Sequence, residues 1–154
     1  MVRRKSTSRF SSIEKDIILS QTDTTVGFIS QNHAKLSEIK SRPTSKPFIK
    51  IYNSFLECES RIPHSKKSFV RRSKKTTFIV KNKAFRINAN LKNSQILRNL
   101  KWHYSTSANE AGKSFNREFC EVKADIIIEN KDGLSECSSS SLIKLTNHKV
   151  RKLR

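Results

Sequence analysis

The sequence predicts a single α/β or α+β domain organised around a sheet. The chain has 154 residues, a length that suits one domain with one hydrophobic core. Short β-branched and apolar runs alternate with segments whose apolar residues have helical spacing. Hydrophobic residues make up 34% of the chain, which is above the composition expected of a wholly disordered protein. Strands that alternate with helices at this density indicate a sheet with helices packed on it.

In the first half of the chain, a tail is expected to precede the fold. Residues 1–12 are basic and Ser-rich, so we expect a mobile tail there and the folded domain in residues 13–154. A helix over residues 33–40 must end near Arg42, because Pro43 disfavours helical geometry in the residue before it. Strands are predicted by the runs at residues 17–19, 26–29 and 48–52.

In the second half, the β-branched run TTFIV at residues 76–80 is the clearest strand. Helices are predicted over residues 94–100 and 115–122, where apolar residues have helical spacing. Further strands are predicted at residues 85–87, 102–105 and 124–129. The serine run 138–141 leads into the apolar segment 142–145 and a basic end.

The charge of the chain names a class of partner. Lys and Arg number 32 against 13 Asp and Glu, which gives a formal net charge of +19. Such a field attracts polyanions such as RNA, nucleotides or acidic membrane surfaces. The three cysteines, Cys58, Cys120 and Cys137, have no CxxC spacing, so neither a zinc site nor a disulfide framework is indicated. We expect reduced thiols, a cytoplasmic location, no protein metal site and no association with a membrane.

Three polar segments stand where predicted strands or helices end, which is where open α/β sheets usually bind ligands. The first, TDTTVG at residues 22–27, offers hydroxyls for a small polar substrate, and Gly27 permits a close backbone approach. The third, STSANEAG at residues 105–112, combines hydroxyls, an amide and backbone N–H groups that suit an anion. A structural turn for the first segment and a helix-capping turn for the third are the competing interpretations.

The second segment, KSRPTSKP at residues 40–47, places two prolines among the cations Lys40, Arg42 and Lys46. Prolines stiffen the backbone, so the three cations are expected to form a fixed cluster that suits a triphosphate. The competing interpretation is one more basic loop in a basic protein. The second segment is not a P-loop, because the GxxxxGK[ST] pattern is absent from a chain with only three glycines.

Together, and in this order, the three segments resemble motifs of the YrdC-like family of threonylcarbamoyl-AMP synthases. TDTTVG resembles the family's PT[DE]T-x-x-G turn, KSRPTSKP its K-x-R-P-x-x-K/N-P signature, and STSANEAG its S-x-S-A-N-x-S-G loop. Weaker similarities in the connecting segments extend the resemblance over roughly residues 17 to 154. The chain departs from the pattern at Gln21, Ser73 to Lys75 and Asn88, where the family has prolines or Pro-Gly-Pro.

The resemblance implies a YrdC-like α/β fold: a single domain with a twisted, mixed, open sheet, flanking helices and a positively charged concave face. It implies a nucleotidyltransferase that makes threonylcarbamoyl-AMP and pyrophosphate from L-threonine, bicarbonate and ATP, with Mg²⁺ arriving on the nucleotide. The product would serve threonylcarbamoyladenosine modification of tRNA at position 37. The implied partners are therefore tRNA or double-stranded RNA and the tRNA threonylcarbamoyl-transfer complex.

The resemblance also assigns roles to residues. The polar tetrad of the family falls on Lys40, Arg42, Ser107 and Asn109. The positions that would contact ATP are Arg42, Lys46, Thr77, Ser107 and Arg151. Those that would surround threonine are Thr22, Arg86, Ser105 and Ser140.

Two alternatives from other classes remain. A non-catalytic RNA-binding protein of the same fold would use the charge of +19 for salt-sensitive phosphate contacts and would not turn over ATP. A ribosome-associated basic protein would have tails that fold on RNA. The order of the three motifs argues against the second of these.

Overall fold

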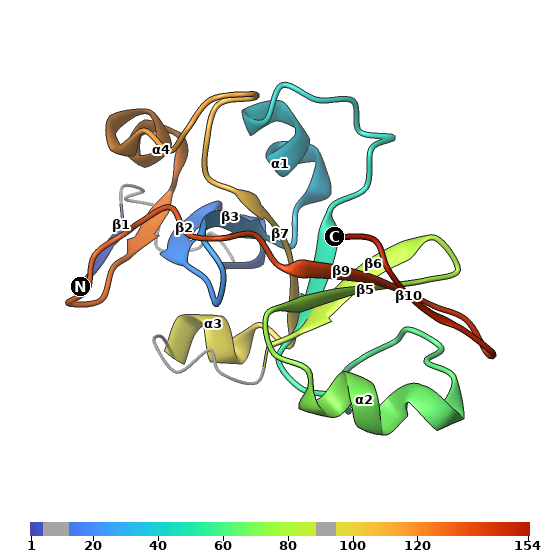
Figure 1. Ribbon diagram of the computed structural model, residues 1–154. Coiled ribbons are helices and arrows are strands. Elements are labelled where there is room, and N and C mark those ends of the chain that lie inside the picture. Colours follow the sequence, from blue (N-terminus) through green and yellow to red (C-terminus); the bar gives the residue numbers. More distant parts are fainter. Residues whose placement is uncertain (5–12, 89–94) are drawn as a thin grey trace.

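The computed structural model describes residues 1–4, 13–88 and 95–154. Within these residues ten strands form one mixed sheet in the order β1-β8-β2-β3-β7-β4-β6-β5-β9-β10 (Figure 1). The strands are β1 (Val2–Arg4), β2 (Ile18–Gln21), β3 (Val26–Ser30), β4 (Ile49–Tyr52), β5 (Thr76–Val80), β6 (Lys83–Ile87), β7 (Trp102–Ser107), β8 (Ile126–Ile128), β9 (Ser141–Leu145) and β10 (Val150–Lys152). The helices are α1 (His33–Ile39), α2 (Lys67–Arg72), α3 (Gln95–Asn99) and α4 (Arg117–Lys123), with 3₁₀ turns at Ile13–Lys15 and His64–Lys66. The predicted α/β fold with a mixed sheet and flanking helices is confirmed.

Helices cover both faces of the sheet, because successive strand residues point to opposite sides. On β3, Phe28 packs in a cluster with Leu36 of α1 and Cys120 of α4. Its neighbour Ile29 packs in a different cluster, with Leu97 and Leu100 at α3. A third cluster joins Val70 of α2 to Tyr52, Phe78 and Phe85. The apolar runs of the sequence thus become two-sided strands of one layered core.

Two of the helices begin with asparagine caps and end where the sequence predicts. The Asn32 side chain accepts a hydrogen bond from the Lys35 N–H at 3.1 Å and starts α1. Asn116 accepts one from the Phe119 N–H at 2.9 Å and starts α4. Helix α1 stops before Ser41, whose positive φ of 47° turns the chain toward the Pro43 loop.

Three elements differ from the sequence-based expectation. Residues 2–4, expected in a mobile tail, form β1, which pairs antiparallel with β8. Residues 5–12 of that tail and Ser94, the first residue of the helix predicted over residues 94–100, lie outside the described residues. The basic stretch before β5 contains α2, a six-residue helix that buries only Val70 and therefore has little apolar periodicity. The basic end forms β10, which turns back and pairs antiparallel with β9.

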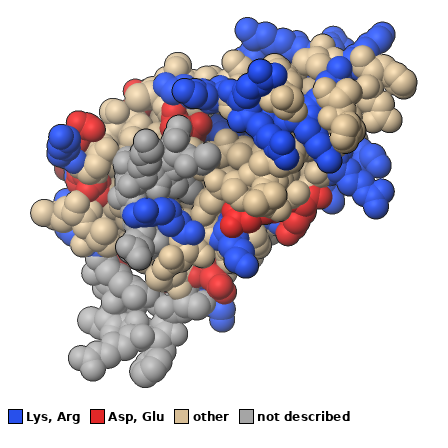
Figure 2. Space-filling model, turned by 90° about the horizontal axis from the view of Figure 1, so that it is seen from below, with Lys and Arg blue, Asp and Glu red and all other residues tan. Residues whose placement is uncertain are grey.

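Charge is distributed unevenly over the surface. Figure 2 shows Lys and Arg gathered toward one end of the face seen from below, at the right of the view, while the fewer Asp and Glu are scattered. That end carries α2 and the β9–β10 hairpin (Figure 1). None of the helices in the described part of the chain has the length and apolar character needed to cross a bilayer.

Candidate active site

A polar cleft on one face of the sheet brings together side chains from all three polar segments of the sequence. Its volume is about 290 Å³. The cleft opens over β3, β7, β4 and β6, which are neighbours in the sheet. Six of the residues predicted from the sequence line it: Thr22, Arg42, Arg86, Ser105, Ser107 and Ser140.

The floor of the cleft needs glycine at position 27. Gly27 pairs with Ser107 where β3 and β7 run antiparallel. A Cβ atom on Gly27 would lie 3.0 Å from the Thr106 carbonyl oxygen and 3.2 Å from the Cγ2 atom of Thr22. The expected close approach of backbone at Gly27 is therefore confirmed, and the neighbour that approaches is the β7 strand.

The Thr22 hydroxyl builds the turn that borders the cleft. It accepts hydrogen bonds from the backbone N–H groups of Thr24 and Thr25, both at 3.2 Å. It also donates to the Thr25 carbonyl oxygen at 2.7 Å. The structural-turn interpretation is thus correct for Thr22, and the turn fixes one wall of the cleft.

Arg86 is buried under the cleft and joins three segments of the chain. One terminal nitrogen donates to the Asp23 carboxylate at 2.7 Å and to the Thr24 hydroxyl at 3.0 Å. The other terminal nitrogen donates to the Thr77 hydroxyl at 3.1 Å, and that hydroxyl lies 2.9 Å from the Ser140 hydroxyl. The Asp23 carboxylate offsets the positive charge that Arg86 carries at this buried position. This network fixes the cleft wall formed by β5, β6 and the segment before β9.

Lys40 lies behind the cleft and does not line it. Its ammonium donates to the Ser107 carbonyl oxygen at 3.1 Å, and to the carbonyl oxygen and Oδ1 of Asn109 at 2.5 and 2.8 Å. The Ser107 hydroxyl donates to the same Asn109 Oδ1 at 2.7 Å, and the Asn109 amide donates to the Lys113 carbonyl oxygen at 2.6 Å. Burial is the main cause that lowers the pKa of Lys40 below its usual value. Lys40 therefore orients the Ser107–Asn109 loop.

Arg42 is held rigidly at the cleft. One terminal nitrogen donates to the carbonyl oxygens of Lys46 and Pro47 at 3.2 and 2.8 Å. Its guanidinium carbon lies 4.3 Å from the centre of the Phe48 ring, a cation–π contact. Its Nε is enclosed and has no hydrogen-bond partner among the described residues. The side chain is thus preorganised, and its planar charge faces the cleft.

The three cations of the second segment do not gather at the cleft. Lys40 is directed into the Ser107–Asn109 loop, and the Lys46 side chain is exposed and does not line the cleft. Helix α1 ends at its C-cap residue Lys40, and the positive φ of Ser41 then turns the backbone. Lys40 and the cations that follow it therefore leave the backbone in different directions. Arg42 alone of the three cations borders the cleft.

A cation that the sequence analysis missed also borders the cleft. Arg151 is exposed on β10 opposite Lys144 and does not line the cleft, whereas Arg154 does. The Arg154 Nε donates to the Ser140 carbonyl oxygen at 3.2 Å, and the Arg154 carbonyl oxygen accepts from the Leu142 N–H at 3.0 Å. The cations of the basic end could have suggested this position, but only the pairing of β10 with β9 brings Arg154 to the cleft.

Hydrogen bonds brace two of the borders where the family pattern has proline. The Gln21 side chain accepts from the Ser135 N–H at 2.9 Å and so ties β2 to the chain before β9. Nearby, the Cys137 N–H donates to the Thr25 hydroxyl at 3.2 Å. Asn88 is buried, and its N–H donates to the Tyr52 carbonyl oxygen at 2.9 Å. The stiffness that proline would supply is replaced here by side-chain and backbone contacts.

These features define a class of site: a polar, cationic cleft at the open face of a mixed α/β sheet. Arg42 and Arg154 give it positive charge, and serine and threonine hydroxyls give it hydrogen-bonding groups. Such a cleft can hold an anion with several oxygen atoms, because guanidinium groups match phosphate and carboxylate geometry.

Comparison with solved structures then gives the particular fold, which is YrdC-like. A variant of P. abyssi Sua5 superposes with a TM-score of 0.73 at 21% identity, covering 90% of this chain and 52% of that protein. P. abyssi Sua5 complexed with L-threonine gives a TM-score of 0.72 at 20% identity, covering 90% of this chain and 50% of that one. E. coli YciO gives 0.69 at 17% identity, covering 91% of this chain and 82% of that protein.

This chain spans about half the length of the Sua5 structures that it matches. Sequence comparison found no matching protein-family model and no matching curated protein. The likeness is therefore one of fold, and it agrees with the fold that the three sequence motifs imply.

Proposed function

We propose that the chain is an L-threonylcarbamoyladenylate synthase, a nucleotidyltransferase that forms threonylcarbamoyl-AMP and pyrophosphate from L-threonine, bicarbonate and ATP for modification of tRNA at position 37. The observation that carries the proposal is the convergence of Thr22, Arg42 and Ser107, one from each of three distant motifs, on one cleft. The same fold is found in a Sua5 structure with L-threonine bound. The acceptor of the product would be a tRNA threonylcarbamoyl-transfer complex.

The proposed division of the cleft follows its charges and hydroxyls. Arg42 and Ser107 would contact the ATP phosphates, and Arg154 would take the place that the resemblance gives to Arg151. The turn at Thr22, together with Ser105 and the Arg86 network, would enclose threonine. Lys40, Asn109 and Thr77 would act as positioning residues, because their hydrogen bonds orient the groups that line the cleft.

The chemistry has two steps. The threonine amine attacks CO₂ derived from bicarbonate and forms a carbamate after losing a proton. A carbamate oxygen then attacks the α-phosphorus of ATP, and the bond to the β-phosphate oxygen breaks to release pyrophosphate. In the second step the carbamate and the ATP phosphates are both anionic, so the contribution of the protein is positioning and stabilisation of the charge that develops on the phosphates. ATP enters as its magnesium complex, in which phosphate oxygens and water are suitable ligands.

The decisive experiment follows pyrophosphate release by the purified chain. We expect release to need ATP, L-threonine and bicarbonate together. Serine should substitute with a loss of about 10- to 200-fold, because one methyl group contributes only about 1–3 kcal/mol. Consumption of ATP that is indifferent to threonine would contradict the proposal and would leave a general nucleotide site.

A pair of variants separates the cleft from the rest of the surface. Ser107→Ala removes a hydroxyl that lines the cleft, and Ser68→Ala removes an exposed hydroxyl on α2 that hydrogen-bonds Arg72 at 3.2 Å. We expect the first substitution to lower the rate of pyrophosphate release and the second to leave it unchanged. Equal rates for the two variants would mean that the cleft is not the reaction site.

A further inference from the structure

A second and larger cleft, of about 530 Å³, opens on the other face of the sheet. Three adjacent strands show this by their alternation. On β4, Ile49 and Ile51 line the first cleft, while Lys50 and Tyr52 line the second. Likewise Arg86 and Phe85 on β6, and Ser105 and Tyr104 on β7, line the first and second clefts respectively. The two clefts are thus separated by the thickness of the sheet, and of the described residues only Pro47 and Phe48 line both.

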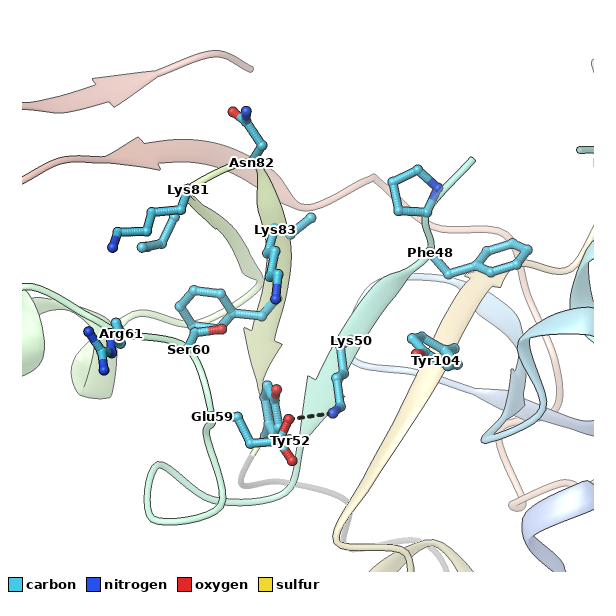
Figure 3. Close-up of a pocket in the computed structure, with 14 residues that line it drawn as sticks. Phe48, Lys50, Tyr52, Glu59, Ser60, Arg61, Lys81, Asn82, Lys83 and Tyr104 are labelled. Carbon is cyan, nitrogen blue, oxygen red and sulfur yellow. Dashed lines mark hydrogen bonds and ion pairs between the residues drawn. The ribbon is translucent and has the colours of Figure 1, made fainter. Parts of the chain in front are cut away.

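The floor and one wall of the second cleft are aromatic. Tyr52 and Phe85 lie in the floor, with ring centres 6.5 Å apart in an edge-on arrangement. Tyr104 forms a wall and is only half buried. Its ring packs edge-on against Trp102 at 5.3 Å, so its position is fixed from behind. Figure 3 shows Tyr104 and Phe48 on one side of the opening and Tyr52 at its base.

The rim of the second cleft is cationic. Lys81 is the first residue of the two-residue turn between β5 and β6, and Lys83 follows the turn directly. Lys81 and Asn82, the two turn residues, have positive φ values of 48° and 62°. Arg61 reaches the rim from the segment before α2 (Figure 3). These three cations are exposed, and no ion pair joins them to an acid in the described part of the chain.

The fourth cation of the cleft, Lys50, has a different role. Its ammonium pairs with Glu59 at 2.7 Å and lies 4.0 Å from the centre of the Trp102 ring. Lys50 therefore offsets Glu59, the one carboxylate among the described residues that line the cleft, and the rim keeps its positive charge.

We propose that this second cleft binds an unpaired nucleotide of an RNA strand, with the base against the aromatic wall and the flanking phosphates at Lys81, Lys83 and Arg61. Unpaired bases are recognised by stacking on aromatic side chains, and cations beside the stack meet the phosphates. The volume of the cleft and the partly exposed ring of Tyr104 suit one planar base, and the rim cations come from two segments that a strand could follow. An acidic protein segment would use the rim but would leave the aromatic wall without a partner.

The proposal does not depend on the proposed synthase activity, because the two clefts open on opposite faces. It is tested first on the unmodified protein, with a fluorescently labelled short single-stranded oligoadenylate and an abasic strand of the same length. The single tryptophan of the chain, Trp102, packs against Tyr104 and Lys50, so its fluorescence reports on the second cleft. We expect oligoadenylate to quench Trp102 and to bind about 10-fold more tightly than the abasic strand.

Two matched double variants test the rim. Lys81→Ala with Lys83→Ala should weaken binding about 10-fold at physiological salt and lower the slope of log affinity against log salt by about 1.4, which corresponds to two lost phosphate contacts. Lys123→Ala with Lys131→Ala changes the net charge equally, on exposed positions near α4 and β8. This control pair should change affinity by less than about twofold.

Further experiments test the aromatic wall and ask whether a free nucleotide binds as tightly as a strand. Tyr104→Phe should keep oligoadenylate binding, and Tyr104→Leu should weaken it about 10-fold. Free AMP should bind at least about 10-fold more weakly than the strand, since it lacks the flanking phosphates. Saturating ATP with threonine should not displace the strand. Each of four results would overturn the proposal. These are equal binding of the abasic strand, an equal loss in the Lys123 and Lys131 control, binding of AMP as tight as that of the strand, and full displacement by ATP.

Discussion

The substitution Arg42→Ala would remove three kinds of contact at once. Arg42 stacks on Phe48, donates to two backbone carbonyls of the 46–47 segment, and presents its charge to the cleft. The stacking is worth about 0.5–1 kcal/mol, and each hydrogen bond contributes about 0.5–1.5 kcal/mol. We therefore expect a stability loss of about 2 kcal/mol, or a fall in Tm of about 4–8 °C for a chain of this size. The folded variant should remain the dominant form at 25 °C.

Expressed as free energy, the loss of transition-state stabilisation in Arg42→Ala should exceed its loss of folding stability. Removing one preorganised donor from a site where anionic charge develops costs about 100-fold or more in rate. Arg42→Lys should restore only part of this, because a point charge does not reproduce the planar fork. Phe48→Leu keeps the charge of Arg42 and removes the ring beneath it. It should therefore lower Tm clearly and have only a small effect on the rate.

The assay measures pyrophosphate release against ATP concentration at saturating threonine and bicarbonate, together with thermal unfolding. The control is Arg72→Ala, an exposed cation on α2 that bonds Ser68 and does not line the cleft. It should leave the rate within about twofold, because a surface cation contributes little at this distance. If Arg42→Ala and Arg72→Ala reduce the rate equally, the placement of Arg42 has no special role and the reasoning is refuted.

Three further predictions concern buried positions. Gly27→Ala places a Cβ 3.0 Å from the Thr106 carbonyl oxygen and should destabilise the fold by about 1–3 kcal/mol, measured by urea unfolding; an unchanged midpoint would contradict the close approach. Burial lowers the pKa of His103 to about 4, so the unfolded state binds its proton first, and about 3 kcal/mol of stability should be lost as pH falls from 6.5 to 4. His103→Leu should flatten that dependence. Because burial also lowers the pKa of Lys40, stability should rise as pH rises toward 10.5, and this rise should be smaller in Lys40→Met.

Much of the candidate site was predictable from the sequence. The motif order implied that Thr22, Arg42 and Ser107 would meet, and the structure brings them to one cleft. The strands and the helices α1 and α4 follow from local signals, namely apolar runs, asparagine caps and the proline after Arg42. These signals act over a few residues, so they can be read along the chain without knowledge of the fold.

Other features depend on pairing between distant segments. Lys40 belongs to a cationic loop in the sequence, yet its partners Ser107 and Asn109 lie 67 and 69 residues away and turn it from the cleft. Arg154 borders the cleft in place of Arg151 because β10 turns back on β9 in one particular register. A shift of one residue would exchange the faces of every side chain on the strand, and local sequence does not fix that register.

What the sequence determined by itself is the fold class, the turn and loop motifs and the residue types of the cleft, because these rest on local backbone preferences and hydrophobic period. Only the tertiary structure decided which side of the sheet each side chain faces. The alternation of Lys50 and Tyr52 with Ile49 and Ile51 is visible in the sequence, but two separate clefts arise only when β4, β6 and β7 lie side by side. Neighbouring strands are joined by hydrogen bonds between residues that are far apart in the sequence. Local sequence does not indicate which of these residues come into contact.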